Sequence, residues 1–115
     1  MKTVLLNELD KPRKLRLETN ALSDAEQVLD MGIGRVMQKE LGIAMIRALL
    51  WAGLKWQDPG LTLTKVGGLM NVYLENGGDL EVLGAKVGEA LIASGLFNKQ
   101  LEGEDPNVEP ETVEE

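Results

Sequence analysis

The chain of 115 residues contains no cysteine and no histidine. It can therefore form neither a disulfide nor a thiolate metal site, and it lacks the commonest general base near neutral pH. It also has no phosphate-binding loop and no paired carboxylates at metal-ligand spacing. Tyr73 beside Lys65 or Glu75 is the one acid–base pair to consider, but its place on a helix stripe favours packing in the core. We expect no enzyme activity, no metal and no cofactor.

No apolar run is long enough to cross a bilayer. The longest, residues 41–54, includes Arg47, whereas a membrane-spanning helix needs about 20 apolar residues. The opening sequence MKTVLL is broken at once by Asn7 and Glu8, unlike a secretion signal. These features predict a soluble, intracellular protein that does not bind membranes.

The net charge of −7 is concentrated at the C-terminus, where residues 99–115 hold seven acidic residues and one basic residue. This segment has few apolar residues, which is typical of a disordered tail. Residues 1–98 are close to neutral and long enough to form one folded domain. A near-neutral domain with an acidic tail disfavours nucleic-acid binding.

A β-hairpin is predicted at the N-terminus, with residues 3–8 and 14–18 on either side of a turn at 10–13. Leu15 and Leu17 alternate with charged residues, as in a half-buried strand. Such a short hairpin needs helices to lie on. Four basic residues gather at its turn, and we interpret them as a solvated tip in preference to a grip for an acidic partner: Lys11, Arg13, Lys14 and Arg16.

The first helix is predicted over residues 24–31. Ser23 and Glu26 have the spacing of a capping box, in which each side chain bonds the other residue's backbone N–H. Gly32 and Gly34 then interrupt the helix, and we interpret them as a connector.

Three further helices complete a mainly α domain of about four helices. A central helix is predicted over residues 36–54; between residues 41 and 54 only Arg47 is charged and apolar residues lie on every side, which implies burial all round. Thr62 is placed to cap the next helix, which residues 76–78 end. Asp79 is placed to cap the last helix, which Gly95 ends, and Phe97 is expected to fold back on the core.

Four segments occur in a characteristic order: LLWAGL at 49–54, DPGLT at 58–62, VGGLMNVYL at 66–74 and ALIASGLF at 90–97. Together with the hairpin and the first helix, this order resembles the small tail assembly chaperones of long-tailed phages and gene transfer agents. The resemblance covers about residues 1–97.

The resemblance implies a cytoplasmic protein of a bacterial host that binds the tape measure protein and the tail tube protein and is absent from the finished particle. The alternative is a structural head–tail completion or connector protein that stays in the virion. The oligomeric state is left open, with a homo-oligomer among the options.

A partner-binding groove is predicted around the turn at residues 58–60, where two helices should diverge. We expect its rim to be formed by Trp56, Leu61 and Met70, since tryptophan is common at binding hot spots and methionine adapts to varied partners. Trp51 is expected to pack in the core.

Overall fold

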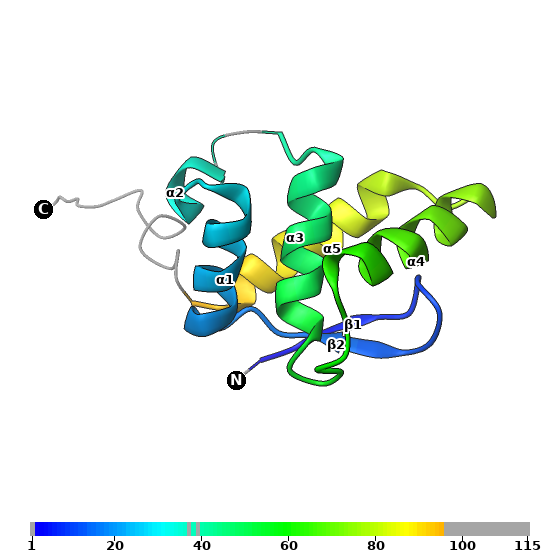
Figure 1. The fold of residues 1–115 in the computed structure, drawn as a ribbon, viewed down its shortest axis with the longest axis horizontal. Helices are drawn as coiled ribbons and strands as arrows, with labels where there is room; N and C mark the ends of the chain where they lie inside the picture. The colour runs from blue at the N-terminus through cyan, green and yellow to red at the C-terminus, as the bar shows by residue number, and fades with distance from the viewer. Residues whose placement is uncertain (1, 37, 39, 96–115) are drawn as a thin grey trace, which may run out of the picture.

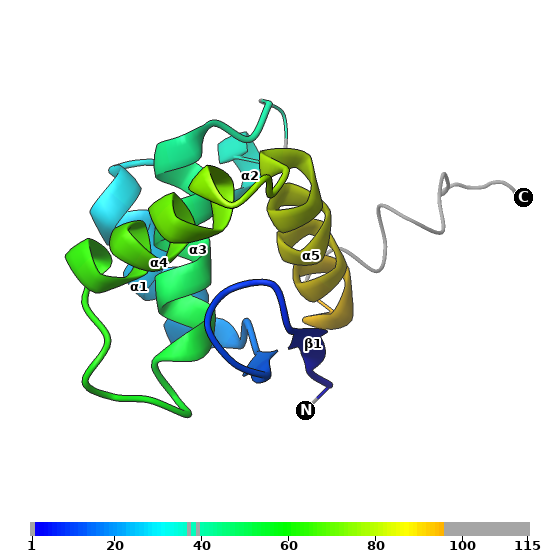
Figure 2. The same cartoon turned by 90° about the vertical axis from the view of Figure 1, so that its right-hand side faces the viewer.

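The computed structural model describes residues 2–36, 38 and 40–95. It confirms a mainly helical domain with a short N-terminal hairpin (Figure 1). The elements are β1 (Val4–Leu6), β2 (Arg13–Leu15), α1 (Thr19–Leu29), α2 (Ile33–Val36), α3 (Ile43–Leu54), α4 (Leu63–Glu75) and α5 (Leu80–Ala93). In the centre, α3 contacts α1, α4, α5 and β2. The hairpin lies below the helices, with β1 against α5 (Figure 2).

The hairpin is antiparallel, with Val4 opposite Leu15 and Leu6 opposite Arg13. Leu15 and the following Leu17 are buried, which confirms the predicted alternation. The boundaries differ from the prediction: Arg13 belongs to β2 instead of the turn, and β2 ends at Leu15. The strands are short because the chain leaves the hairpin to bond the end of α3.

The predicted capping box is wrong. Helix α1 begins at Thr19, and its N-cap is Glu18, whose carboxylate accepts hydrogen bonds from the N–H groups of Ala21 at 2.7 Å and Asn20 at 3.2 Å. Ser23 thus lies inside the helix. The Glu26 carboxylate instead accepts a bond from the Ile33 N–H at 2.7 Å, which ties the end of α1 to the start of α2.

The central helix is shorter than predicted. Residues 33–36 form the one-turn helix α2, which includes Gly34, so the predicted connector is partly helical. Helix α3 starts only at Ile43, after Gly42 in an extended conformation. Complete burial is also wrong, because Ile43 and Ala44 in its first turn are exposed. The buried part of α3 runs from Ile46 onward.

The far end of α3 packs closely on the hairpin. A Cβ added at Gly53 would lie 2.5 Å from Leu15 Cδ1, so only glycine allows this approach. Trp51 is half-buried against the core, and its indole N–H donates to the Leu61 carbonyl at 3.3 Å.

The caps of the last two helices are confirmed. The Thr62 hydroxyl accepts from the Lys65 N–H at 3.1 Å, and the Asp79 carboxylate accepts from the Glu81 N–H at 2.9 Å. Gly77, with φ of 91°, makes the turn between α4 and α5.

One apolar core joins the hairpin to every helix. Its largest fully buried side chains are Leu6, Leu15, Leu17, Val36, Ile46, Leu49, Leu50, Leu54, Val66, Leu83, Val87 and Leu91. Among the described residues, no helix has the length and apolar character to cross a membrane. The acidic tail predicted at 99–115 and the predicted fold-back of Phe97 lie outside the described residues.

Candidate functional site

The three predicted partner-binding residues do not share one rim. Met70 is 2 % exposed and Leu61 is 8 % exposed, so both belong to the core. Trp56 is 39 % exposed, but it lies with Arg16 and Lys55 in a different hollow from the one that Met70 lines. A partner-binding role for these residues stays a prediction, and the groove must be drawn elsewhere.

The hollow at Met70 is a groove between α3 and α4 with a volume of about 470 Å³. We call it the α3–α4 groove. Its lining residues are Ile43, Ala44, Arg47, Thr64, Gly67, Met70, Asn71 and Leu74. Ile43 is 57 % exposed, an unusual position for the first residue of an otherwise buried helix. The groove therefore presents apolar surface that the described residues do not cover.

Small residues keep the groove open. Ala44 on α3 and Gly67 on α4 contribute little bulk to its walls. The Arg47 side chain passes over Gly67, where an added Cβ would lie 3.4 Å from Arg47 Cδ and 3.7 Å from Nη1. The absence of a side chain at Gly67 thus lets Arg47 lie across α4.

Arg47 is half-buried, and its Nε atom has no hydrogen-bond partner. Its side chain forms no ion pair or hydrogen bond with any residue that the structure describes. The described lining of the groove contains no Asp or Glu. In the sequence Arg47 stands out only as an interruption of an apolar run, and a lone charge in such a run is a signal of a special position.

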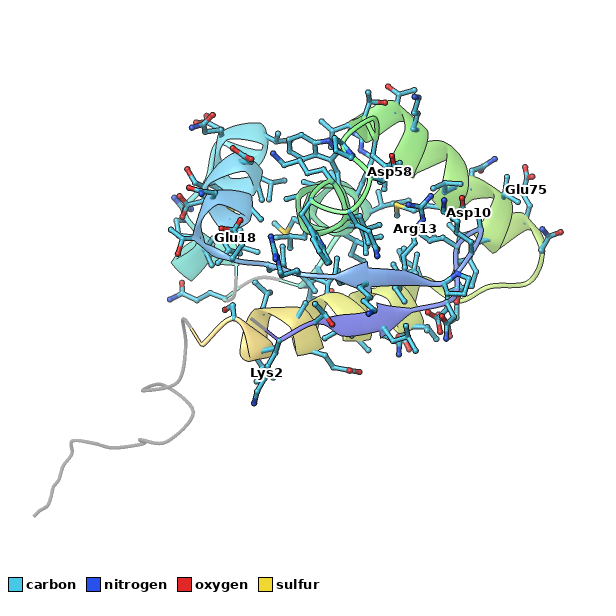
Figure 3. The ribbon with its side chains drawn as sticks, turned by 90° about the horizontal axis from the view of Figure 1, so that it is seen from below. Lys2, Asp10, Arg13, Glu18, Asp58 and Glu75 are labelled. Carbon is cyan, nitrogen blue, oxygen red and sulfur yellow. The ribbon has the colours of Figure 1, made fainter. Side chains whose placement is uncertain are left out.

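At the opposite end of α3, polar groups are paired. Arg13 is only 5 % exposed, and its guanidinium donates to Asp10 at 2.8 and 2.9 Å and to Asp58 at 3.3 Å (Figure 3). The hydrogen bonds that Arg13 donates hold the pKa of Asp10 below its ordinary value, and the same bonds to the Asp10 carboxylate raise the pKa of Arg13. The predicted solvated tip is therefore wrong for Arg13.

The segment after α3 also bonds the outer edge of β2. The Lys14 N–H donates to the Gln57 side chain at 3.1 Å, and the Lys14 carbonyl accepts from the Trp56 indole N–H at 3.1 Å. The Arg16 N–H donates to the Gly53 carbonyl at 2.9 Å. We call these contacts, together with the Arg13–Asp58 pair, the hairpin clamp.

A second hollow, of about 390 Å³, lies beside the hairpin clamp. Its charged groups already have partners: Lys55 pairs with Asp24, Glu18 caps α1, and the Arg16 guanidinium lies 4.2 Å from the centre of the Trp56 ring. Because the Arg16 side chain is stacked on Trp56, the prediction of a solvated tip is also wrong for Arg16. The Arg16 Nε, like that of Arg47, has no hydrogen-bond partner, but the Arg16 guanidinium is stacked on an aromatic ring.

Tyr73 has a structural role. Its hydroxyl donates to the Asp79 carbonyl at 3.1 Å and accepts from the Asp79 N–H at 3.0 Å, and its ring lies against Gly78. These bonds close the loop between α4 and α5. No group of His, Cys, Asp and Glu within the described ranges has the arrangement of a metal site.

No family model, no curated protein and no solved structure matches this chain. The choice between the candidate binding surfaces therefore depends on the geometry of the described residues.

Proposed function

We propose that the chain is a non-catalytic chaperone that holds an apolar helix of another protein in the α3–α4 groove. The observation that carries the proposal is the exposed first turn of α3, where Ile43 opens into a groove with a mostly apolar and small-residue lining. Two packed helices form a natural seat for a third helix. Met70, which is almost completely buried, lies at the base of the groove.

The order of segments that resembles tail assembly chaperones supports a specific version of this proposal. In that version the partners are the tape measure protein and the tail tube protein, and binding takes place in the cytoplasm of a bacterial host. Long apolar helices expose surface that aggregates unless another protein covers it. A groove of this kind provides such cover.

The test is co-expression of the full chain with a tape measure protein. Ile43→Asp places a charge on the groove wall, and we expect it to reduce the soluble yield of the partner. Val28→Asp is the matched control, because Val28 is another exposed apolar residue on a different helix, α1. Circular dichroism would check that both variants stay folded.

Trp56→Ala separates the two hollows. Because Trp56 lies beside β2 and not in the α3–α4 groove, we expect this variant to retain partner capture. Equal solubility of the partner with and without the chain would contradict the chaperone proposal. Stoichiometric recovery of the chain in mature particles would favour the structural head–tail component instead.

A further inference from the structure

The three arginines of the hairpin and of α3 have different surroundings. Arg13 is paired with two carboxylates, and Arg16 is stacked on an indole. The Nε atoms of Arg16 and Arg47 are both buried without a hydrogen-bond partner, but Arg47 also lacks an ion pair or a stacked ring among the described residues. A charged group that loses water without gaining a partner destabilises the state in which it is buried. Arg47 is therefore the one of the three whose charge the described fold leaves unmatched.

The groove around Arg47 is positive and apolar. The polar side chains beside Arg47 belong to Thr64 and Asn71, which are neutral. The carboxylate of Glu75 accepts a hydrogen bond from the Asn71 amide at 3.2 Å and does not line the groove. No described residue supplies Arg47 with a negative charge, whereas an occupant of the groove can supply one.

The shape and chemistry of the groove favour a helix as its occupant. An extended segment would need backbone hydrogen bonds along the groove, but beyond their first turns the N–H groups of α3 and α4 are bonded within their own helices. A helix satisfies its own backbone and presents only side chains. Apolar side chains suit Ile43, Met70 and Leu74.

We propose that the α3–α4 groove selects a helix of another protein that carries one carboxylate among apolar residues, and that this carboxylate pairs with the Arg47 guanidinium. The inference rests on the proposed function and names the chemistry of the partner. A guanidinium binds a carboxylate through two parallel hydrogen bonds, which fixes the position of the partner along the groove. A lysine at the same place on the partner is repelled by Arg47, which gives selectivity.

The test uses three synthetic amphipathic helices of alanine and leucine that differ at one central position on the apolar face, which is Glu, Gln or Lys. Their affinities for the full chain are measured by fluorescence anisotropy. We expect the Glu peptide to bind about tenfold more tightly than the Gln peptide, and the Lys peptide to bind most weakly. Arg47→Gln should abolish the difference between the Glu and Gln peptides, and Arg47→Glu should make the Lys peptide the tightest.

Controls keep the result specific to this position. Arg35→Gln removes an exposed arginine of α2 and should change no affinity. Arg47→Lys keeps the charge but loses the planar fork, so it should retain part of the preference for Glu. Circular dichroism of each variant would show that it is folded.

The two proposals fail in different ways. Equal binding of all three peptides that is lost in Ile43→Asp would overturn the carboxylate inference and leave the groove as the binding site. Binding by none of them, or binding unaffected by Ile43→Asp, would overturn both. A dimer that dissociates in Arg47→Glu, or displacement of the Glu peptide by a peptide of residues 96–115, would show that the occupant comes from this chain and would also overturn the inference.

Discussion

The two ends of α3 have similar apolar sequences but different surroundings. At the C-terminal end, in and around the hairpin clamp, Arg13 is paired with acids and both indole N–H groups have a carbonyl acceptor. At the N-terminal end, Ile43 faces outward and Arg47 has no partner among the described residues. Paired polar groups stabilise the C-terminal end, whereas the N-terminal end exposes apolar surface and has an arginine without a partner among the described residues. Such a contrast on one helix supports the proposal that a partner binds at the less satisfied end.

The largest expected difference between positions on α3 is in the free energy of unfolding, when a core residue is compared with an exposed one. Leu50 is fully buried on α3, whereas Ile43 lies on the exposed first turn of the same helix. Leu50→Ala should lower the free energy of unfolding by about 2–5 kcal/mol through lost apolar contact and a cavity. Ile43→Ala should change it by less than about 0.5 kcal/mol. Urea denaturation measures both, and Leu83→Ala on α5 should behave like Leu50→Ala.

Substitutions of Arg13 and Arg47 should give the next largest difference in the free energy of unfolding. Arg13→Met removes charge-assisted hydrogen bonds to Asp10 and Asp58, so it should cost about 1.5–3 kcal/mol. Arg47→Met removes a group with no bond to lose, so stability should stay unchanged or rise. Equal destabilisation by both substitutions would contradict the distinction between the two ends.

Two neighbouring glycines on α4 sharpen the comparison with a smaller effect. A Cβ added at Gly68 would have no neighbouring atom within 4 Å, so Gly68→Ala should stabilise the helix by about 0.5–1 kcal/mol. Gly67→Ala should gain less, because its Cβ would touch Arg47 Cδ at 3.4 Å. Its methyl group also enters the groove, so only Gly67→Ala should weaken partner capture. Thermal unfolding and the co-expression assay measure the two effects.

The smallest expected effect is the pH dependence of the Arg13–Asp10 pair. Because Arg13 lowers the pKa of Asp10 in the folded state, the pair stabilises the fold above about pH 4, the ordinary range of an Asp carboxyl. This stability is lost as the pH falls through the lowered pKa. The carboxylate is partly exposed, so the change should stay below about 1 kcal/mol. Denaturation at pH 6 and pH 3 measures it, and Asp10→Asn should reduce the difference.

Local signals in the sequence predicted the caps at Thr62 and Asp79 correctly, because a cap bonds backbone only two or three residues away. The same reasoning failed at Ser23. There the packing of Ala21, Leu22 and Ala25 in the core extends α1 toward the N-terminus, where Glu18 takes over as the cap. Tertiary packing thus overrode a correct local pattern.

The site was harder to predict than the fold. Trp56 is of a residue type that is common at binding hot spots, but its indole N–H donates to a carbonyl 42 positions earlier in the chain. Arg13 and Asp58 are similarly distant in sequence. The openness of the α3–α4 groove depends on how α3 and α4 diverge, which no short motif encodes. Met70 was predicted on a groove rim with Trp56 and Leu61, but it lines a different groove, and Ile43 and Arg47 are recognisable as its neighbours only in three dimensions.

The hairpin clamp also bears on self-association. An uncovered strand edge offers free N–H and C=O groups to other chains and promotes ordered aggregation. Along β2, the side chains of Gln57 and Trp56 occupy the backbone groups of Lys14, and the Gly53 carbonyl occupies the N–H of Arg16. These three contacts occupy backbone hydrogen-bonding groups as a neighbouring strand would, but they add no further strand edge. A loop with two polar-tipped side chains can therefore end a sheet and keep a crowded solution of this protein from stacking edge to edge.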